Sequence, residues 1–171
     1  MLSKKQILKL FEKLNQKLSD HEVKGEIYLL GGAVMCLASN ARASTKDLDA
    51  VFSPKSKIRE LALEIAREEK LPQDWLTDSV KEFLSENASF ETYLNLSNLS
   101  ILVASAEYIL AMKCLSMRIG LEFHDEQDVR YLLRYLNIDS CKEALLTIER
   151  YYPLEQLPQK SFYALEEILG K

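Results

Sequence analysis

Two aspartates separated by one residue, Asp47 and Asp49, are the side chains in this sequence whose type and spacing best suit chemistry. They begin the segment 47–52, Asp-Leu-Asp-Ala-Val-Phe, which is typical of a strand. Residues two apart on a strand point to the same side, about 6.7 Å from each other. Two negative charges at that separation repel by roughly 2.5 kcal/mol at an effective dielectric of about 20. A partly buried pair therefore favours a divalent cation, and we expect Mg²⁺, together with the phosphates of a nucleotide, at these carboxylates.

A glycine pair precedes the aspartates in the chain. Gly31 and Gly32 follow the apolar run 26–30, and residues 33–46 separate them from Asp47. A glycine-rich turn lets backbone N–H groups approach phosphate oxygens because no Cβ is in the way. The blander alternative is an exposed strand that carries two aspartates by chance after an ordinary glycine turn.

Three polar residues lead into the acidic strand: Arg42, Thr45 and Lys46. They either contact phosphate or form a solvated loop, and we favour the phosphate contact. Together with Gly31 and Gly32 they make up the nucleotide-binding residues predicted in this segment, and Lys113, further along the chain, is predicted to bind the nucleotide as well.

The glycine pair followed by acidic-hydrophobic-acidic resembles the signature of the DNA polymerase β-type nucleotidyltransferase superfamily. In that superfamily the glycine pair holds the triphosphate and the acids bind catalytic Mg²⁺, usually after a slightly shorter gap. The segments 42–49, 71–76 and 104–113 are similar to a bacterial group of nucleotidyltransferase-like proteins, related to AbiEii-type abortive-infection toxins. The resemblance covers about residues 25–137.

The resemblance implies transfer of a nucleotidyl group from a nucleoside triphosphate to a hydroxyl of an RNA, a protein or a small molecule. It also implies that a helix lysine, Lys113, and a downstream aspartate, Asp125 or Asp128, complete the catalytic site with Asp47 and Asp49. Lys113 would neutralise charge on the transferred phosphate. The residues themselves leave alternatives open, because a lysine on an apolar helix also extends to the rim. Aspartates in a first helical turn also favour the helix dipole.

One departure from the family concerns the third metal-binding carboxylate. Two-metal nucleotidyl transfer normally takes it from an adjacent strand, but residues 92–104 contain no acidic side chain. Glu91 precedes and Glu107 follows this segment, and neither is well placed. The alternative function is a non-catalytic nucleotidyltransferase fold that acts through a partner protein, as one component of a toxin–antitoxin pair.

Hydrophobic periodicity predicts the elements that position these residues. We expect an α/β (α+β) fold: a small mixed sheet with flanking helices of the nucleotidyltransferase type in about 1–104, then a helical C-terminal part in about 105–171, packed on it in a single domain. Strands are predicted at 26–30 and 47–52, with a hairpin over 90–103. Helices are predicted at 4–18, 33–39, 54–70, 74–83, 105–118, 124–136, 140–151 and 159–169.

Composition narrows the functional classes further. With 26 acidic against 22 basic residues, the net charge of −4 disfavours a protein that mainly grips duplex nucleic acid. No apolar stretch approaches the roughly 20 residues that span a bilayer, and the N-terminus is unlike a secretion signal. Cys36, Cys114 and Cys141 fit neither a disulfide framework nor a CxxC site and are expected as buried small hydrophobes. We therefore expect a cytoplasmic protein without membrane contacts.

Overall fold

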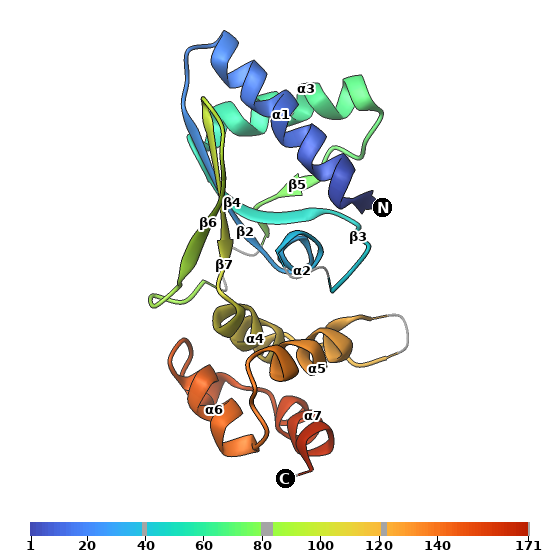
Figure 1. Cartoon of the computed structure of the whole chain (residues 1–171), viewed down its shortest axis with the longest axis vertical. Helices are drawn as coiled ribbons and strands as arrows, with labels where there is room; N and C mark the ends of the chain where they lie inside the picture. The colour runs from blue at the N-terminus through green and yellow to red at the C-terminus, as the bar shows by residue number, and fades with distance from the viewer. Residues whose placement is uncertain (39–40, 80–83, 121–122, 171) are drawn as a thin grey trace. The chain divides into compact units, whose positions relative to one another are not determined.

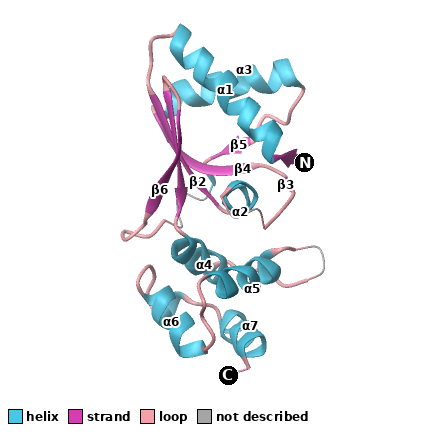
Figure 2. Ribbon diagram, in the orientation of Figure 1, coloured by secondary structure: helices cyan, strands magenta, loops and turns pink. Residues whose placement is uncertain are grey.

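The structure is a computed structural model that describes residues 1–38, 41–79, 84–120 and 123–170. It has the expected mixed α/β architecture, with a five-stranded mixed sheet, a two-stranded sheet and a helical C-terminal part (Figures 1 and 2). The chain forms two compact units. Unit 1 comprises Met1–Glu82 and Phe90–Ala104, and unit 2 comprises Phe83–Ser89 and Ser105–Lys171.

The main sheet of unit 1 has the strand order β5-β4-β2-β7-β6. β2 runs antiparallel to β4 and parallel to β7, while β5 runs parallel to β4 and β6 antiparallel to β7. The hairpin predicted over 90–103 is therefore confirmed as β6 and β7. The strands are β2 (Gly25–Leu30), β4 (Leu48–Ser53), β5 (Leu76–Thr77), β6 (Phe90–Asn95) and β7 (Leu99–Ala104).

One face of this sheet carries the core of unit 1. Helices α1 (Lys4–Asp20) and α3 (Lys55–Glu69) contact each other, and they also contact β7 and β4 respectively. The strand residues on this face alternate with less buried ones, as the two-residue period of a strand requires. The buried residues of β2, β4 and β7 on this face are Ile27, Leu29, Leu48, Ala50, Phe52, Leu99, Ile101 and Val103.

Helix α1 forms as the sequence predicts. Ser3 is the N-cap, and its hydroxyl accepts from the backbone N–H of Gln6, whose side chain accepts from Ser3 in return. This reciprocal capping box satisfies two backbone donors that the helix itself leaves unpaired. The apolar side chains that helical periodicity brings onto one face of this predicted helix are buried: Ile7, Leu10, Phe11, Leu14 and Leu18. Burial of each such side chain contributes roughly 1.5–3 kcal/mol, which fixes the helix on the sheet.

The segment that joins β2 to β4 contains the candidate site residues. Helix α2 (Gly32–Leu37) follows β2 immediately, as predicted. The two-residue strand β3 (Ser44–Thr45) then pairs antiparallel with β1 (Leu2–Ser3) in a separate small sheet. Neither β1 nor β3 is predicted from the sequence, because two residues are too short to show a period.

The predicted helix over 74–83 is wrong in its first part. Trp75 is buried in a turn, and its indole N–H donates to the carbonyl of Ala62 in α3 at 2.9 Å. Residues Leu76 and Thr77 form β5 beside β4 instead of a helical turn. Sheet pairing with β4 outweighs local helix preference here, and residues 80–83 lie outside the described part of the chain.

Unit 2 is helical, and its four predicted helices are confirmed with ends shifted by a few residues. Ser105 and Ser140 cap α4 and α6, accepting from the backbone N–H groups of Tyr108 and Glu143. Tyr108 is fully buried and stacks on Tyr151, with ring centroids 5.0 Å apart. The helices are α4 (Ala106–Leu115), α5 (Asp125–Tyr135), α6 (Cys141–Glu149) and α7 (Gln159–Leu169), with a 3₁₀ turn at Leu154–Gln156.

The expected burial of the three cysteines is confirmed for two of them. Cys36 and Cys114 are buried as expected, whereas Cys141 is only half-buried because it begins α6 at the surface of its unit. Burial raises the pKa of the Cys114 thiol to about 12, so this thiol stays protonated.

None of the helices in the described ranges has the length and apolar character needed to cross a membrane.

Candidate functional site

The glycine turn and the acidic strand meet in unit 1. The antiparallel register of β2 and β4 pairs Leu30 with Asp49, so Gly31 comes directly after the partner of Asp49. Gly31 has φ +62° and ψ −140°, a conformation that residues with a Cβ rarely adopt. A Cβ placed on Gly31 would lie 3.2 Å from Asp49 Oδ2. The sheet register thus puts the candidate phosphate turn against a candidate metal ligand.

The second glycine lies against the loop that leads into the acidic strand. A Cβ on Gly32 would lie 2.7 Å from Arg42 Nη1 and 2.9 Å from Thr45 Oγ1. The start of this loop is held by the end of α2, since the Met35 carbonyl accepts from the N–H groups of Ala41 and Arg42 at 2.8 and 3.3 Å. Glycine is therefore needed at position 32 so that the Arg42 and Thr45 side chains can approach the turn.

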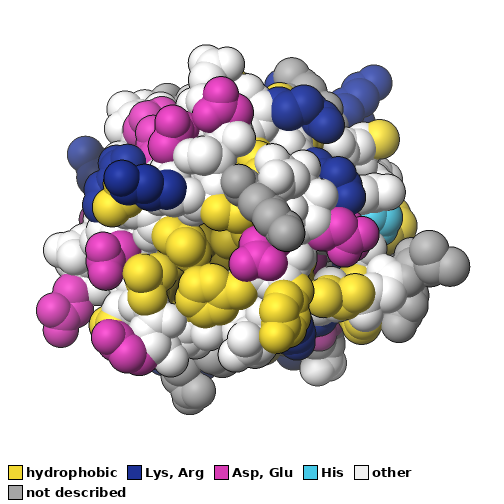
Figure 3. Space-filling model, turned by 90° about the horizontal axis from the view of Figure 1, so that it is seen from below, with side chains coloured by type: hydrophobic (Ala, Val, Ile, Leu, Met, Phe, Trp, Pro, Cys, Tyr) yellow, Lys and Arg dark blue, Asp and Glu magenta, His cyan; other side chains and the backbone are white. Residues whose placement is uncertain are grey.

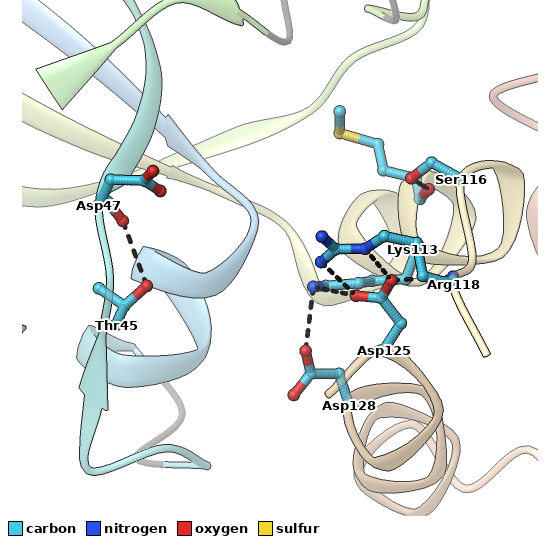
Figure 4. A network of polar contacts seen from close by, with 8 residues as sticks. Thr45, Asp47, Lys113, Ser116, Arg118, Asp125 and Asp128 are labelled. Carbon is cyan, nitrogen blue, oxygen red and sulfur yellow. Dashed lines mark hydrogen bonds and ion pairs between the residues drawn. The ribbon is translucent and has the colours of Figure 1, made fainter. Parts of the chain in front are cut away.

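The two aspartates share one side of the acidic strand. Asp47 directly precedes β4 and Asp49 is its second residue, so both point away from the face that carries Leu48. Both are half-buried, and each makes contacts within the chain. The Thr45 hydroxyl donates to the backbone carbonyl of Asp47 at 3.2 Å, as the left half of Figure 4 shows. Lys46, the remaining predicted phosphate ligand, is exposed.

The carboxylates of Asp47 and Asp49 suit one magnesium ion that is bound together with phosphates. Within the described ranges, no three His, Cys, Asp or Glu side chains gather in a group that could hold a metal. Mg²⁺ is commonly held by one or two carboxylates plus substrate phosphates and water, which Asp47 and Asp49 beside the glycine turn can provide. The absence of a third carboxylate from residues 92–104 agrees with this smaller set.

The strand on the other side of β4 is followed by an acid that sequence reasoning overlooked. Asp78 comes one residue after Thr77, the register partner of Asp49 in the parallel strand β5. Alternation along the strand directs Asp78 to the opposite face. There its Oδ2 is 3.4 Å from Lys55 Nζ and 3.0 Å from Arg59 Nη2, both on α3. Asp78 therefore joins β5 to α3 rather than replacing the third metal ligand.

The predicted site residues of unit 2 form a buried ion-pair cluster. Lys113 Nζ lies 3.1 Å from Asp125 Oδ1 and 3.0 Å from Asp128 Oδ2 (Figure 4, right half). All three side chains are at most 11% exposed. Lys113 therefore neither extends to the rim nor lacks a partner, because two carboxylates already hold its ammonium group. The two aspartates lie in the first turn of α5, where they favour the helix dipole, and their side chains also pair with Lys113.

Arg118 completes this cluster and is a residue that sequence reasoning missed. Asp125 Oδ2 accepts from both the backbone N–H and Nε of Arg118, at 3.0 and 2.9 Å. The guanidinium also lies over the ring of Phe123, 4.7 Å from its centroid. Burial by itself raises the pKa of Asp125, but the Arg118 hydrogen bonds and the Lys113 charge outweigh it and lower this pKa to about 2. Asp125 is therefore ionised at every physiological pH.

A groove in unit 1 is lined by residues other than those of the candidate site and of the ion-pair cluster around Lys113. It has a volume of about 580 Å³ and lies along α1, with Leu2, Lys13 and Glu69 among its lining residues. The glycine turn and Asp47 and Asp49 are not part of it. This groove is therefore distinct from the candidate site, which is identified by the chemistry of its residues.

Comparison with known proteins adds no relative. No protein-family model matches the chain, and no curated protein or solved structure matches it significantly. A function for this chain is therefore argued from the geometry of its own residues.

Proposed function

We propose that this protein is a Mg²⁺-dependent nucleotidyltransferase whose substrate is a nucleoside triphosphate. The observation that carries the proposal is the approach of Gly31 to Asp49. A Cβ on Gly31 would lie 3.2 Å from Asp49 Oδ2, so phosphates on the turn are within reach of a metal on the carboxylate. A glycine with positive φ at this point is costly to replace, which supports a role for close backbone approach.

Different residues of unit 1 bind the metal and the phosphates. Asp47 and Asp49 hold Mg²⁺, which when bound neutralises phosphate charge and polarises a phosphoryl oxygen. The Gly31–Gly32 turn offers backbone N–H groups to the phosphates. Arg42, whose Nη1 lies beside Gly32, supplies a positive charge next to the turn.

The acceptor is a hydroxyl of an RNA end, a protein side chain or a small molecule. Its oxygen forms the new bond to the α-phosphorus of the triphosphate, while pyrophosphate leaves and the hydroxyl proton is released. The net charge of −4 disfavours a large RNA surface and favours a small contact with the acceptor. The free thiols of Cys36, Cys114 and Cys141 accord with a reducing cytoplasm as the place of reaction.

Calorimetric titration of the four nucleoside triphosphates, with and without Mg²⁺, tests the proposal. The wild-type chain is expected to bind at least one of them only when Mg²⁺ is present. Asp47→Asn and Asp49→Asn should each weaken that binding at least tenfold, because an amide does not replace a carboxylate at a hard cation. Transfer of label from the α-phosphate, and not from the γ-phosphate, to an acceptor then identifies nucleotidyl transfer.

Asp20→Asn is the matched control for this experiment. Asp20 is an exposed carboxylate of unit 1 at the end of α1, close to the start of β2, whereas Asp49 pairs with Leu30 at the other end of that strand, so the substitution changes the net charge equally without touching the acidic strand. Binding should be unaffected by Asp20→Asn. Equal losses in all three variants, or no binding of any triphosphate to the wild type, would rule out the proposed site.

A second candidate function is partner binding without catalysis, and a surface of unit 2 favours it. Leu146 of α6 and Tyr163 of α7 are 54% and 61% exposed. Figure 3 shows one face of the molecule, on which hydrophobic side chains gather with acidic and basic side chains around them. Exposed apolar patches commonly mark protein interfaces. Under this alternative, a Leu146→Ser/Tyr163→Ser variant loses an in-cell cross-link to a partner protein, while Asp49→Asn keeps it.

A further inference from the structure

One buried threonine touches both halves of the candidate site in unit 1. Thr45 is 4% exposed, and its hydroxyl donates to the carbonyl of Asp47 at 3.2 Å. The same oxygen would lie 2.9 Å from a Cβ on Gly32. Thr45 is thus packed between the glycine turn and the residue that opens the acidic strand, as its position beside Asp47 in Figure 4 illustrates.

A two-residue strand from the start of the chain holds Thr45 in this place. Leu2 pairs with Thr45 and Ser3 with Ser44 in antiparallel register. Leu2 is itself 5% exposed, and Ser3 is fixed by its capping box with Gln6 at the start of α1. The loop before the acidic strand is therefore anchored through β1 to a long helix of the core.

We propose that Thr45, held by β1, is a positioning residue that sets the spacing between the Gly31–Gly32 turn and Asp47. This inference rests on the proposed function, since it concerns how phosphates on the turn and a metal on the aspartates are bound together. It assigns Thr45 an indirect role in place of the direct phosphate contact expected from the sequence. The hydroxyl suits this role because it is buried and already donates to the protein backbone.

If Thr45 is a positioning residue, its substitution should weaken the joint binding of metal and triphosphate rather than the binding of either ligand alone. If the hydroxyl is removed, the carbonyl of Asp47 loses this hydrogen bond, so Asp47 can shift relative to the Gly31–Gly32 turn although β1 still holds the loop. Asp47 and Asp49 still offer two carboxylates to a metal, so metal binding by itself is retained. Only the joint binding of metal and triphosphate requires the two halves at the correct spacing.

The experiment compares Thr45→Val and Thr45→Ser with the wild type. Mn²⁺ serves as the metal probe, first alone and then with the triphosphate that the wild type binds best, and both affinities are measured by calorimetry. Thr45→Val keeps the branched shape and removes the donor, and loss of one such hydrogen bond weakens the joint binding about tenfold. Mn²⁺ alone should bind Thr45→Val within about twofold of the wild type, and Thr45→Ser should restore the joint affinity.

Thr92→Val is the matched control, because Thr92 is exposed on β6 of the same unit and away from this loop. It should leave both affinities unchanged. Unchanged joint binding in Thr45→Val would overturn the inference, and so would an equal loss of Mn²⁺ binding alone, which would place Thr45 in the metal site itself. No triphosphate binding by the wild type is a different failure, because it removes the proposed function first.

Leu2→Ala provides a second test of the same proposal if Thr45→Val does not fold. It shortens the side chain opposite Thr45 while leaving the hydroxyl and both aspartates intact. Joint binding of Mn²⁺ and triphosphate should fall several-fold, with binding of Mn²⁺ alone retained. A Leu2→Ala protein that is folded, as judged by its melting temperature, and binds both like the wild type would contradict the role given to β1.

Discussion

Gly31 and Asp49 lie against each other at the end of a pair of antiparallel strands, and a side chain at position 31 would crowd the Asp49 carboxylate. The register pairs Leu30 with Asp49, and a Cβ on Gly31 would be 3.2 Å from Asp49 Oδ2. A turn that is free of side chains beside a half-buried carboxylate is the feature of this molecule that best suits a metal-bound phosphate.

Replacing Gly31 should therefore harm both stability and binding. Gly31→Ala forces a Cβ into a backbone conformation that costs roughly 1–3 kcal/mol and also presses it on Asp49. We expect a lower melting temperature and at least a tenfold loss of Mg²⁺-dependent triphosphate affinity. Gly170→Ala is the matched control, because Gly170 also has positive φ but nothing lies within 4 Å of its Cβ position. A Gly31→Ala protein with wild-type affinity would show that the turn does not bind phosphate.

Gly32→Ala is expected to act mainly through its neighbours. Its φ is not positive, so backbone strain is small, but its Cβ would lie 2.7 Å from Arg42 Nη1 and 2.9 Å from Thr45 Oγ1. The flexible end of Arg42 can move, whereas buried Thr45 has little freedom. The melting temperature should fall by less than it does in Gly31→Ala, while the triphosphate affinity still falls several-fold. If the melting temperature drops further than in Gly31→Ala, the loop is more rigid than we infer.

Breaking the buried ion pairs should destabilise unit 2 strongly. Asp125→Asn leaves the ammonium of Lys113 with Asp128 as a carboxylate partner, so the cost should approach but not exceed the roughly 3–5 kcal/mol that an uncompensated buried charge costs. Urea unfolding followed by circular dichroism measures the effect. Glu126→Gln on the same helix is the control, because Glu126 pairs with Arg130 at the surface and its loss should cost less than about 1 kcal/mol. Similar costs for both variants would mean that burial adds nothing to the cluster.

The acid stability of the protein should depend on Asp125. Its pKa of about 2 lies below the usual 3.8, so the folded state binds this proton less readily than the unfolded state does. The resulting stabilisation, about 2 kcal/mol, is complete above about pH 5 and is lost progressively as the pH falls through 3.8 and then through about 2. Asp125→Asn should therefore flatten the fall of the urea midpoint between pH 4 and pH 2.

Glu68→Gln provides the comparison for that pH series. Hydrogen bonds from Lys17 and Lys13 lower the pKa of Glu68 as well, but its side chain is 44% exposed. Solvent screens such a pair, so its removal should leave the pH profile nearly unchanged. A flattened profile in Glu68→Gln and not in Asp125→Asn would reverse the assignment.

Much of the fold follows from local patterns that any reader of the sequence can find. The stripe from Ile7 to Leu18 predicts α1 because a helix brings residues three and four apart onto one face. The alternation at 47–52 predicts β4 and the shared side of Asp47 and Asp49 for the same kind of reason. The glycine pair and the acidic pair are likewise visible as residue types at a given spacing.

Other features depend on residues that the chain brings together from a distance. Trp75 is buried against α3 and is followed by β5, although its segment has a helical pattern, because pairing with β4 is available there. The contact of Leu2 with Thr45 joins two strands too short to have a period. No local rule predicts such pairings, since their energy comes from partners elsewhere in the sequence.

The sequence by itself determined which residues are able to do chemistry and which local elements carry them. Only the tertiary structure decided their surroundings: that Gly31 meets Asp49, that Thr45 lies between the two halves of the site, and that Lys113 is buried with Asp125 and Asp128. The physical reason is that periodicity and propensity act over a few neighbouring residues. Register, burial and ion pairing are set by the packing of the elements of each unit, and these decide whether a charged side chain is paired or able to bind a ligand.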